Sequence, residues 1–143
     1  MRYAVLIARF LLGAPFVVFG LNTFLWAVFD RAFMEPPNDM PAGAASFQQA
    51  LTDTRFMHPV RGGVEFAGGL MILTGIMAPL GLTILAPVIV HIVLYHHYLD
   101  TRGLVIAYTL LGLELFLAYA YGQAFRGLLT PFAKARWDKK EAP

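Results

Sequence analysis

The sequence predicts an all-α integral membrane protein: an antiparallel, up-down four-helix bundle with one outer loop that carries a short amphipathic helix. Three observations support this fold: an apolar composition, four long apolar runs, and very short connections between the last three runs. Hydrophobic residues make up 58% of the 143 residues and charged residues only 14%, and the mean hydropathy is +0.61. Soluble domains carry about 25% charged residues. The balance therefore excludes a cytosolic enzyme, a nucleic-acid-binding protein and a disordered chain.

Each apolar run is long enough to cross a bilayer, because about 20 helical residues span a hydrocarbon layer of about 30 Å. Backbone polar groups must be satisfied internally in lipid, so every run is expected to be a helix. The short connections make neighbouring helices antiparallel. The expected spans are residues 3–29, 60–78, 80–99 and 103–125, with the outer loop at 30–59. Residues 1–129 are thus one four-span membrane domain, and residues 130–143 are a basic cytoplasmic tail.

Basic residues are distributed unequally between the two ends of the predicted spans. The side that holds both termini carries six of them: Arg2, Arg126, Lys134, Arg136, Lys139 and Lys140. The other side carries Arg31, Arg55, Arg61 and Arg102, offset by acidic residues. Cytoplasmic segments of membrane proteins carry the excess of Lys and Arg. A multi-pass protein with both termini in the cytoplasm is therefore expected.

The long loop divides into two halves. The prolines between Phe33 and Pro41 exclude a regular helix there. In the second half, Ser46 and Gln49 form a capping-box pattern, and apolar residues from Phe47 onward recur at helical spacing. This pattern predicts a short amphipathic helix over the outer mouth of the bundle. A packed lid is favoured over a segment that grips a ligand.

Polar residues inside the predicted spans are the candidates for function, because such groups are costly in a bilayer and usually face inward. We expect Glu65 to meet His96 or Asn22 near the outer mouth. The candidates for ligand binding or a proton path are Glu65, His91, Tyr95, His96, Glu114, Arg9 and Asn22.

A second pairing is expected closer to the bilayer midplane. His91 and Glu114 lie at similar depth in their helices, and Arg9 is expected to reach toward Glu114 from the cytoplasmic side. The alternative is that these polar residues only form hydrogen bonds between helices. Both interpretations stay open at the level of sequence.

No intrinsic cofactor and no metal are expected. No two histidines of residues 80–99 are three or four positions apart, so this helix presents no two-histidine metal face. A bis-histidine haem would need a histidine from another helix, for which only His58 is available. The absence of cysteine excludes disulfides, thiolate metal sites and a thiol nucleophile.

Small residues mark the faces on which helices are expected to approach closely. Gly68, Gly69 and Gly75 share the face of Glu65, and the first span has Gly13 and Gly20 on one face. Small residues allow close backbone approach between helices in membranes. Close approach of a neighbouring helix is therefore expected on each of these faces.

The chain resembles the DoxX family of small bacterial four-helix membrane proteins over about residues 7–131. The motifs are ARFLLG at 8–13, FGLN at 19–22, the Met/Pro-rich MEPPNDMP at 34–41, EFAGGL at 65–70, LAPVIV at 85–90 and LEL at 113–115. Relatives often carry an amide at the position of His91. The resemblance implies a location in the bacterial inner membrane. Members linked to thiosulfate oxidation act with quinone, and others associate with redox-stress partners, so it also implies quinone as a ligand.

Two functions follow as hypotheses. The first is a quinone-linked redox subunit that acts with a partner, since a chain without cysteine has no ligands for an iron–sulfur cluster. The alternative is a non-enzymatic accessory or assembly subunit of a larger membrane complex. Transport is a third hypothesis and would require an oligomer. The expected partners are the lipid bilayer and other membrane subunits or further copies of the chain, and no nucleic acid.

Overall fold

The computed structural model describes residues 2–35 and 39–126, and the regular secondary structure of this part of the chain is entirely helical. The predicted basic tail at 130–143 lies outside the described residues. The helices are α1 (Arg2–Phe29), α2 (Ala42–Asp53), α3 (Met57–Thr74), α4 (Ala78–Tyr98), α5 (Leu104–Ala120) and α6 (Gly122–Phe125), with a 3₁₀ turn, η1 (Thr101–Gly103), before α5.

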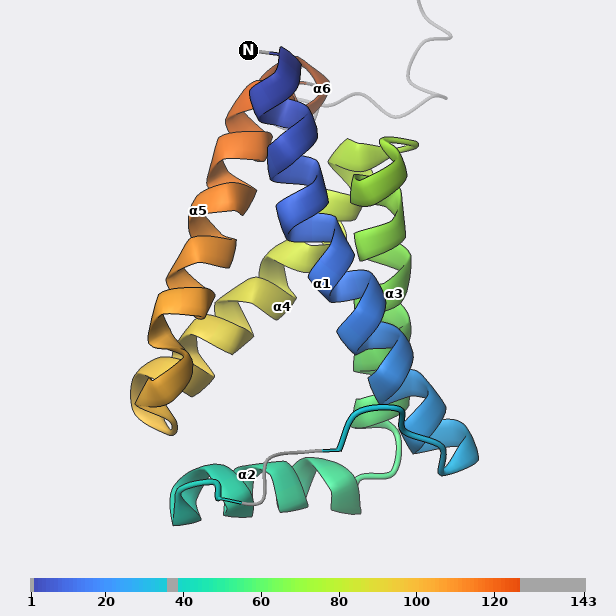
Figure 1. The fold of residues 1–143 in the computed structure, drawn as a ribbon, viewed down its shortest axis with the longest axis vertical. Coiled ribbons are helices and arrows are strands. Elements are labelled where there is room, and N and C mark those ends of the chain that lie inside the picture. The colour runs from blue at the N-terminus through green and yellow to red at the C-terminus, as the bar shows by residue number, and fades with distance from the viewer. Residues whose placement is uncertain (1, 36–38, 127–143) are drawn as a thin grey trace, which may run out of the picture.

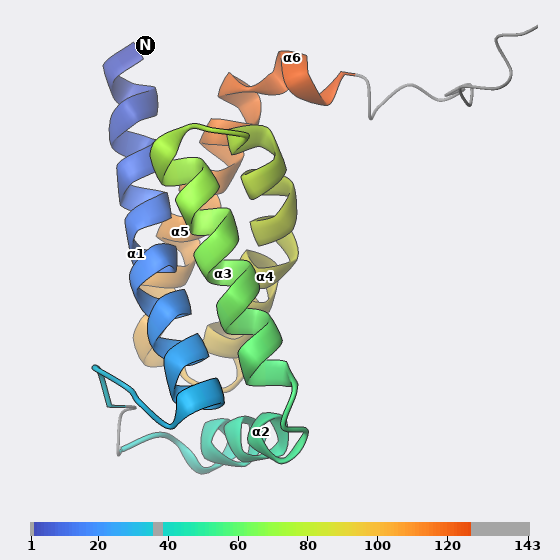
Figure 2. The same ribbon diagram turned by 90° about the vertical axis from the view of Figure 1, so that its right-hand side faces the viewer.

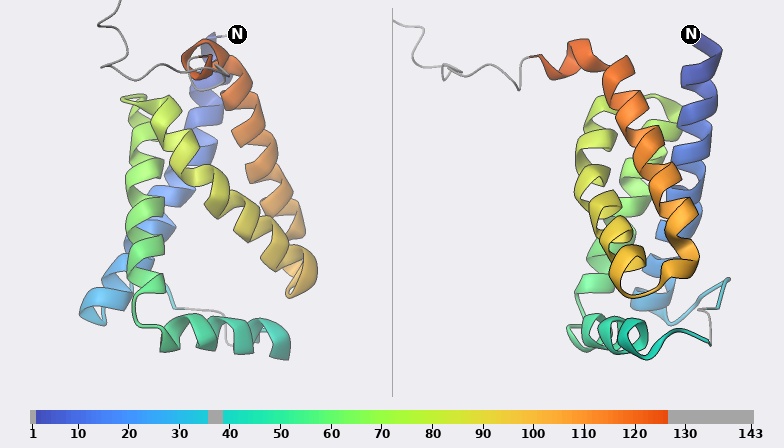
Figure 3. Two further views of the ribbon diagram at one scale, coloured as in Figure 1. Left: turned by 180° about the vertical axis from the view of Figure 1, so that it is seen from behind. Right: turned by 90° about the vertical axis from the view of Figure 1, so that its left-hand side faces the viewer.

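Four long helices form a closed ring of contacts, in which α1 packs against α3 and α5, and α4 packs against α3 and α5. The start of α1 and α6 lie at one end, and α2 lies across the other end (Figures 1 and 2). Toward α2, the pair of α4 and α5 diverges from the pair of α1 and α3 (Figures 1 and 3). We call the half next to α6 the terminal half, and the half under α2 the lid half.

By length and composition, three segments can cross a membrane: α1, α4, and the continuous stretch Thr101–Ala120. The sequence predicts four, and α3 is the difference. It contains the predicted run 60–78 only up to Thr74, where Gly75 takes a left-handed conformation with φ 81° and ends the helix. Its first half also carries Arg61 and Glu65, which lower its hydropathy. The last predicted span is likewise shorter, since α5 ends at Ala120.

The two glycine-lined faces for which close helix approach is expected pack against each other, one on α1 and the other on α3. A Cβ atom added to Gly13 would lie 2.8 Å from the backbone nitrogen of Leu73, and one added to Gly69 would lie 2.8 Å from the nitrogen of Val17. A Cβ at Gly20 would lie 2.5 Å from the nitrogen of Phe66. Side chains at these positions would push the two backbones apart.

The hydrophobic core lies mainly in the terminal half. Six large side chains are less than 2% exposed, and all belong to the four long helices: Leu12, Ile72, Leu82, Leu85, Ile89 and Leu117. The terminal half is thus filled by aliphatic side chains from every helix of the ring.

Helix α2 exists as predicted but does not begin at the predicted capping box. It begins at Ala42, and Ser46 lies inside it. Pro41 occupies the N-cap with an extended ψ of 147°, and its carbonyl accepts a hydrogen bond from the Ala45 nitrogen at 2.9 Å. Alanine-rich sequence after Pro41 favours an early start. Gln49 bonds to Asp53 Oδ1 at 2.9 Å instead of capping.

Candidate functional site

The lid half contains a partly open cavity of about 440 Å³, lined by residues of α1, α3, α4 and α5 and by Gln48 of α2. We call it the central cavity. Its apolar wall includes Phe16, Phe19 and Leu110. Its polar lining side chains are Thr23, Gln48, Arg61, Glu65, His91, Tyr95 and His96. The divergence of the helix pairs, visible in Figure 3, leaves room for it in this half of the molecule.

Four of the candidate residues from the sequence line this one cavity: Glu65, His91, Tyr95 and His96. Glu65 comes from α3, and the other three come from the second half of α4. Arg9, Asn22 and Glu114 do not line it. The structure thus brings together the candidates of the second and third predicted spans.

Glu65 pairs with Arg61, one turn earlier on α3. Arg61 Nε and Glu65 Oε1 are 3.3 Å apart, and Glu65 is only 6% exposed. The predicted partners, His96 and Asn22, make no hydrogen bond to Glu65 among the described residues, although His96 lines the same cavity. The distribution of basic residues predicts Arg61 at the outer surface. Its spacing of four residues from Glu65 on a helix was the signal that could have identified it.

Phe47 of α2 covers the two rings on α4 that face the cavity. Its ring centroid lies 5.6 Å from that of His91 and 5.9 Å from that of Tyr95. The hydroxyl of Tyr95 lies 3.9 Å from Met40 Sδ, which is a weak acceptor. The packed-lid interpretation of this loop agrees with these contacts.

His96 is held in one orientation at the edge of the cavity. Its Nδ1 donates to the carbonyl oxygen of Asp100 at 2.8 Å, and its ring packs edge-on against Tyr95 with centroids 5.1 Å apart. A side chain at Gly103 would collide with the ring. In the neutral ring, donation from Nδ1 leaves Nε2 as an acceptor.

Arg9 and Asn22 have structural partners away from the cavity. Arg9 donates from Nε to the carbonyl of Ile72 at 2.8 Å and from Nη2 to that of Leu73 at 3.0 Å, which satisfies carbonyls at the end of α3. Asn22 Oδ1 accepts from the backbone nitrogen of Met34 at 2.9 Å, and its Nδ2 donates to the Met34 carbonyl at 3.1 Å. Asn22 therefore holds the loop against α1.

The expected pairing of Glu114 with His91, and of Arg9 with Glu114, is not present in the structure. Glu114 is 6% exposed, and within the described ranges its Oε2 has no hydrogen-bond partner. Arg9 is instead committed to the end of α3. Glu114 lies one turn beyond Leu110 on a similar face of α5, further toward the terminal half than the cavity-lining part of the helix.

The segment 39–53, which contains α2, contacts the rest of the bundle near both of its ends. At the start, Arg102 Nη1 bonds to Asp39 Oδ2 at 2.7 Å, while Arg102 Nε and Nη2 bond to the two carboxylate oxygens of Asp100 at 2.8 Å each. These hydrogen bonds from Arg102 lower the pKa of Asp100 to about 2. At the end, the Thr52 hydroxyl and His58 Nε2 are 3.2 Å apart. Trp26 packs edge-on against His58, with centroids 5.1 Å apart.

The sequence model of the DoxX family matches residues 4–98. The matched segment contains α1 to α4 and therefore every α3 and α4 residue of the central cavity. No curated protein and no solved structure matches the chain.

Proposed function

The chain belongs to the DoxX family of membrane proteins, and on that premise we propose that its central cavity binds the headgroup of a quinone and that the protein is a quinone-linked redox subunit. The observation that carries the proposal is the constellation of Arg61, Glu65, His91 and Tyr95 around one cavity under a helical lid. The volume of about 440 Å³ falls within the usual range for small-molecule sites, roughly 300–1,000 Å³.

The donors that a quinone requires are available. The terminal nitrogens of Arg61 have no hydrogen bond in the described part of the chain, and its Nε is also without one. Among the described residues, the Tyr95 hydroxyl has a single partner, the sulfur of Met40 at 3.9 Å. These groups supply two donors for carbonyl oxygens, while apolar side chains such as Phe16 and Ile92 pack against the ring. When bound, a quinone supplies two-electron redox chemistry coupled to protons.

Entry of the ligand from the lipid is supported by the exposed side chains at the cavity edge. Phe19 on α1 is 57% exposed and Ile106 on α5 is 67% exposed, and both line the cavity. The two helices diverge toward this edge (Figure 1). A hydrocarbon tail leaves between them, and Glu65 and His91 hold or accept protons at the opposite, polar wall.

The membrane arrangement is part of the proposal. We infer four antiparallel spans in the bacterial inner membrane, with α3 included because its polar residues face the central cavity and the pair Arg61–Glu65 reduces the cost of burying charge. Both termini are placed in the cytoplasm and α2 on the outer surface. Electrons come from a partner subunit, since the chain has no cysteine for a cluster.

The test is binding of a short-chain ubiquinone and a short-chain menaquinone to the full chain in lipid nanodiscs. Tyr95→Phe removes one hydrogen bond and is expected to weaken binding about three- to tenfold, and Arg61→Gln at least about tenfold. Tyr98→Phe is the matched control, because Tyr98 is on the same helix and 75% exposed. Absence of saturable binding, or equal loss in all three variants, overturns the proposal.

The accessory or assembly subunit remains the second candidate, favoured by the lack of an electron relay in this chain. It predicts that the protein is isolated without quinone, does not bind added quinone, and co-purifies in fixed ratio with a larger membrane subunit. Quinone extraction and subunit stoichiometry distinguish the two functions.

A further inference from the structure

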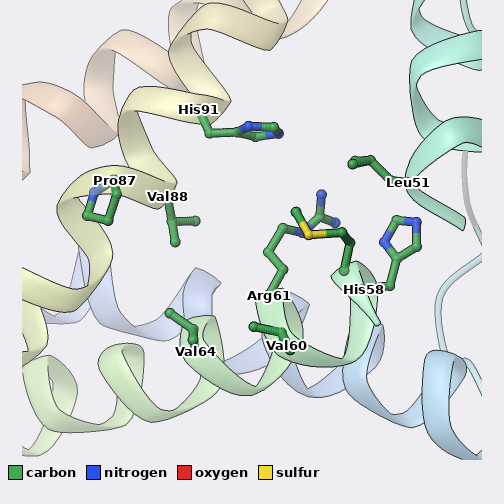
Figure 4. A pocket seen from close by; sticks show the side chains of 9 residues that line it. Leu51, His58, Val60, Arg61, Val64, Pro87, Val88 and His91 are labelled. Carbon is green, nitrogen blue, oxygen red and sulfur yellow. The ribbon is translucent and has the colours of Figure 1, made fainter. Parts of the chain in front are cut away.

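A second pocket, of about 230 Å³, shares Arg61 and His91 with the central cavity but is otherwise lined by different residues; Figure 4 shows its lining. We call it the side pocket. Its walls come from α2, α3 and α4 and are mostly aliphatic, with Val64 and Val88 on facing helices. These two valines line the side pocket and not the central cavity.

The polar groups at the side pocket are all nitrogen-bearing: His58, Arg61 and His91. His58 is engaged with α2, through the Thr52 hydroxyl and the backbone of Gln48. The guanidinium group of Arg61 points into the space between His58 and His91 (Figure 4). Glu65, which pairs with Arg61 Nε, lines the central cavity and not this pocket. The pocket lining therefore offers hydrogen-bond donors and no carboxylate, which suits an acceptor such as a carboxylate.

Arg61 has donors to spare for that anion. Its Nε faces Glu65 Oε1 at 3.3 Å, whereas its two terminal nitrogens make no hydrogen bond with any described residue. The planar fork of arginine matches a carboxylate with two parallel hydrogen bonds. His91 makes ring contacts with Phe47 but no hydrogen bond within the described part, so its ring can serve as a further donor.

The aliphatic walls and the position of Arg61 indicate that the anion is one end of an apolar molecule. Val60 and Met57, at the edge of the pocket, are 58% and 37% exposed. Arg61 lies four residues after the start of α3, or about 6 Å along the helix, close to the exposed end of the pocket. A hydrocarbon chain can therefore leave past Val60 while its charged end stays on Arg61.

We propose that the side pocket binds a long-chain monocarboxylate, a fatty acid from the bilayer, with its carboxylate on Arg61 and His91. The side pocket shares Arg61 and His91 with the central cavity, but palmitate binding there does not require that the central cavity binds quinone. The shared chemistry, a carboxylate on a hydrocarbon body, also occurs in soluble short-chain acids, and the test separates the two sources.

The experiment measures saturable binding of radiolabelled palmitate to the full chain in nanodiscs of zwitterionic lipid. Hexadecanol, which has the same chain without the charge, is expected to compete at least about tenfold more weakly than unlabelled palmitate. Octanoate is expected to compete at least about tenfold more weakly as well, since it buries less hydrocarbon. Equal competition by hexadecanol overturns the carboxylate site, and equal competition by octanoate overturns the bilayer source.

Substitutions separate this site from the quinone site. Val64→Phe fills the side pocket and is expected to abolish palmitate binding while quinone binding is unchanged. Leu70→Phe, on the same helix and 43% exposed, is the matched control and is expected to leave both palmitate binding and quinone binding unchanged. Ile106→Trp narrows only the central cavity and is expected to reduce quinone binding alone. Palmitate binding that survives Val64→Phe, with helicity and elution volume preserved, contradicts the proposal.

Two substitutions of Arg61 test its role in binding the carboxylate, one that removes the charge and one that keeps the charge but changes the side-chain geometry. Arg61→Gln is expected to weaken palmitate binding at least about tenfold, and Arg61→Lys to restore only part of it because lysine lacks the fork. Unchanged palmitate affinity in Arg61→Gln, with hexadecanol still excluded, overturns the assignment of the carboxylate to Arg61.

Discussion

The terminal half and the lid half are built from the same four helices but differ in what fills the space between them. In the terminal half, aliphatic side chains such as Leu82 and Leu85 are no more than 1% exposed. In the lid half, α4 and α5 diverge from α1 and α3, and two cavities meet at Arg61 and His91. The comparison indicates that stability is concentrated in the terminal half and binding in the lid half.

The largest expected difference between the halves is the effect of truncating a core side chain. Leu85→Ala leaves a cavity in the filled half and is expected to lower the free energy of unfolding by about 2–5 kcal/mol. Ile106→Ala, at an exposed edge of the lid half, is expected to cost less than about 0.5 kcal/mol. Thermal unfolding in detergent measures both, and similar losses would remove the distinction between the halves.

A smaller loss is expected where α1 and α3 are closest. Gly69→Ala places a Cβ 2.8 Å from the Val17 nitrogen and is expected to destabilise the protein by about 1–3 kcal/mol. A Cβ atom added at Gly112 would have no described atom of another residue's side chain or of a neighbouring helix within 4 Å. Gly112→Ala is therefore expected to be neutral or slightly stabilising, because alanine favours the helical conformation more than glycine does. The same unfolding assay applies. A neutral Gly69→Ala would show that the two helices can separate without cost.

The lid is expected to loosen without unfolding the bundle when its aromatic contact is removed. Phe47→Ala deletes the contacts with His91 and Tyr95, which contribute about 0.5–1.5 kcal/mol. Amide hydrogen exchange of α2 should rise up to about tenfold, with exchange in the terminal half unchanged. Phe33→Ala, at a residue 55% exposed, is the control. Unchanged exchange in α2 would mean that other contacts hold the lid.

The smallest expected effect is a response to acid at the turn between α4 and α5. Hydrogen bonds from Arg102 lower the pKa of Asp100 to about 2 from an ordinary value of 3.8. Because the pKa is lowered in the folded protein, the stabilisation of the turn by the Asp100 carboxylate is complete above about pH 4 and is lost as the pH falls through about 2. Arg102 is 47% exposed, so solvent screens the pair and the loss is small.

Hydrogen exchange at residues 99–104 checks this response, with Asp100→Asn as the reference at each pH. The native turn is expected to approach the exchange of Asp100→Asn only below pH 4. If the two proteins differ equally at pH 2 and pH 6, the carboxylate does not hold the turn.

Much of the fold follows from local sequence. The helix order follows from the apolar runs, and the close approach of α1 to α3 follows from Gly13 and Gly69. The end of α3 was misplaced because Gly75 looks like a packing residue in sequence but adopts a positive φ. The start of α2 was misplaced because Pro41 caps it through its backbone, which the capping-box pattern does not represent.

The sequence predicts only part of the site, because it does not fix how far along the bundle each polar side chain lies. The polar residues of α4 were identified because a charge or imidazole in an apolar run is conspicuous. Arg61 was missed because it lies near a helix end, where a basic residue usually marks the membrane surface. The predicted partner of Glu114 is wrong because the relative positions of two helices along the bundle depend on packing across it, and Glu114 lies beyond the cavity-lining part of α5.

The hollow lid half is tested most directly by cysteine labelling, since the chain has no cysteine of its own. Thr23→Cys places a thiol in the central cavity, and Leu82→Cys places one in the terminal core, at a site 1% exposed. A small membrane-permeant maleimide is expected to label Thr23→Cys and not Leu82→Cys, and a short-chain quinone is expected to slow the labelling of Thr23→Cys. Equal labelling at the two positions, or labelling of Thr23→Cys at the same rate with and without quinone, would contradict a ligand cavity in the lid half.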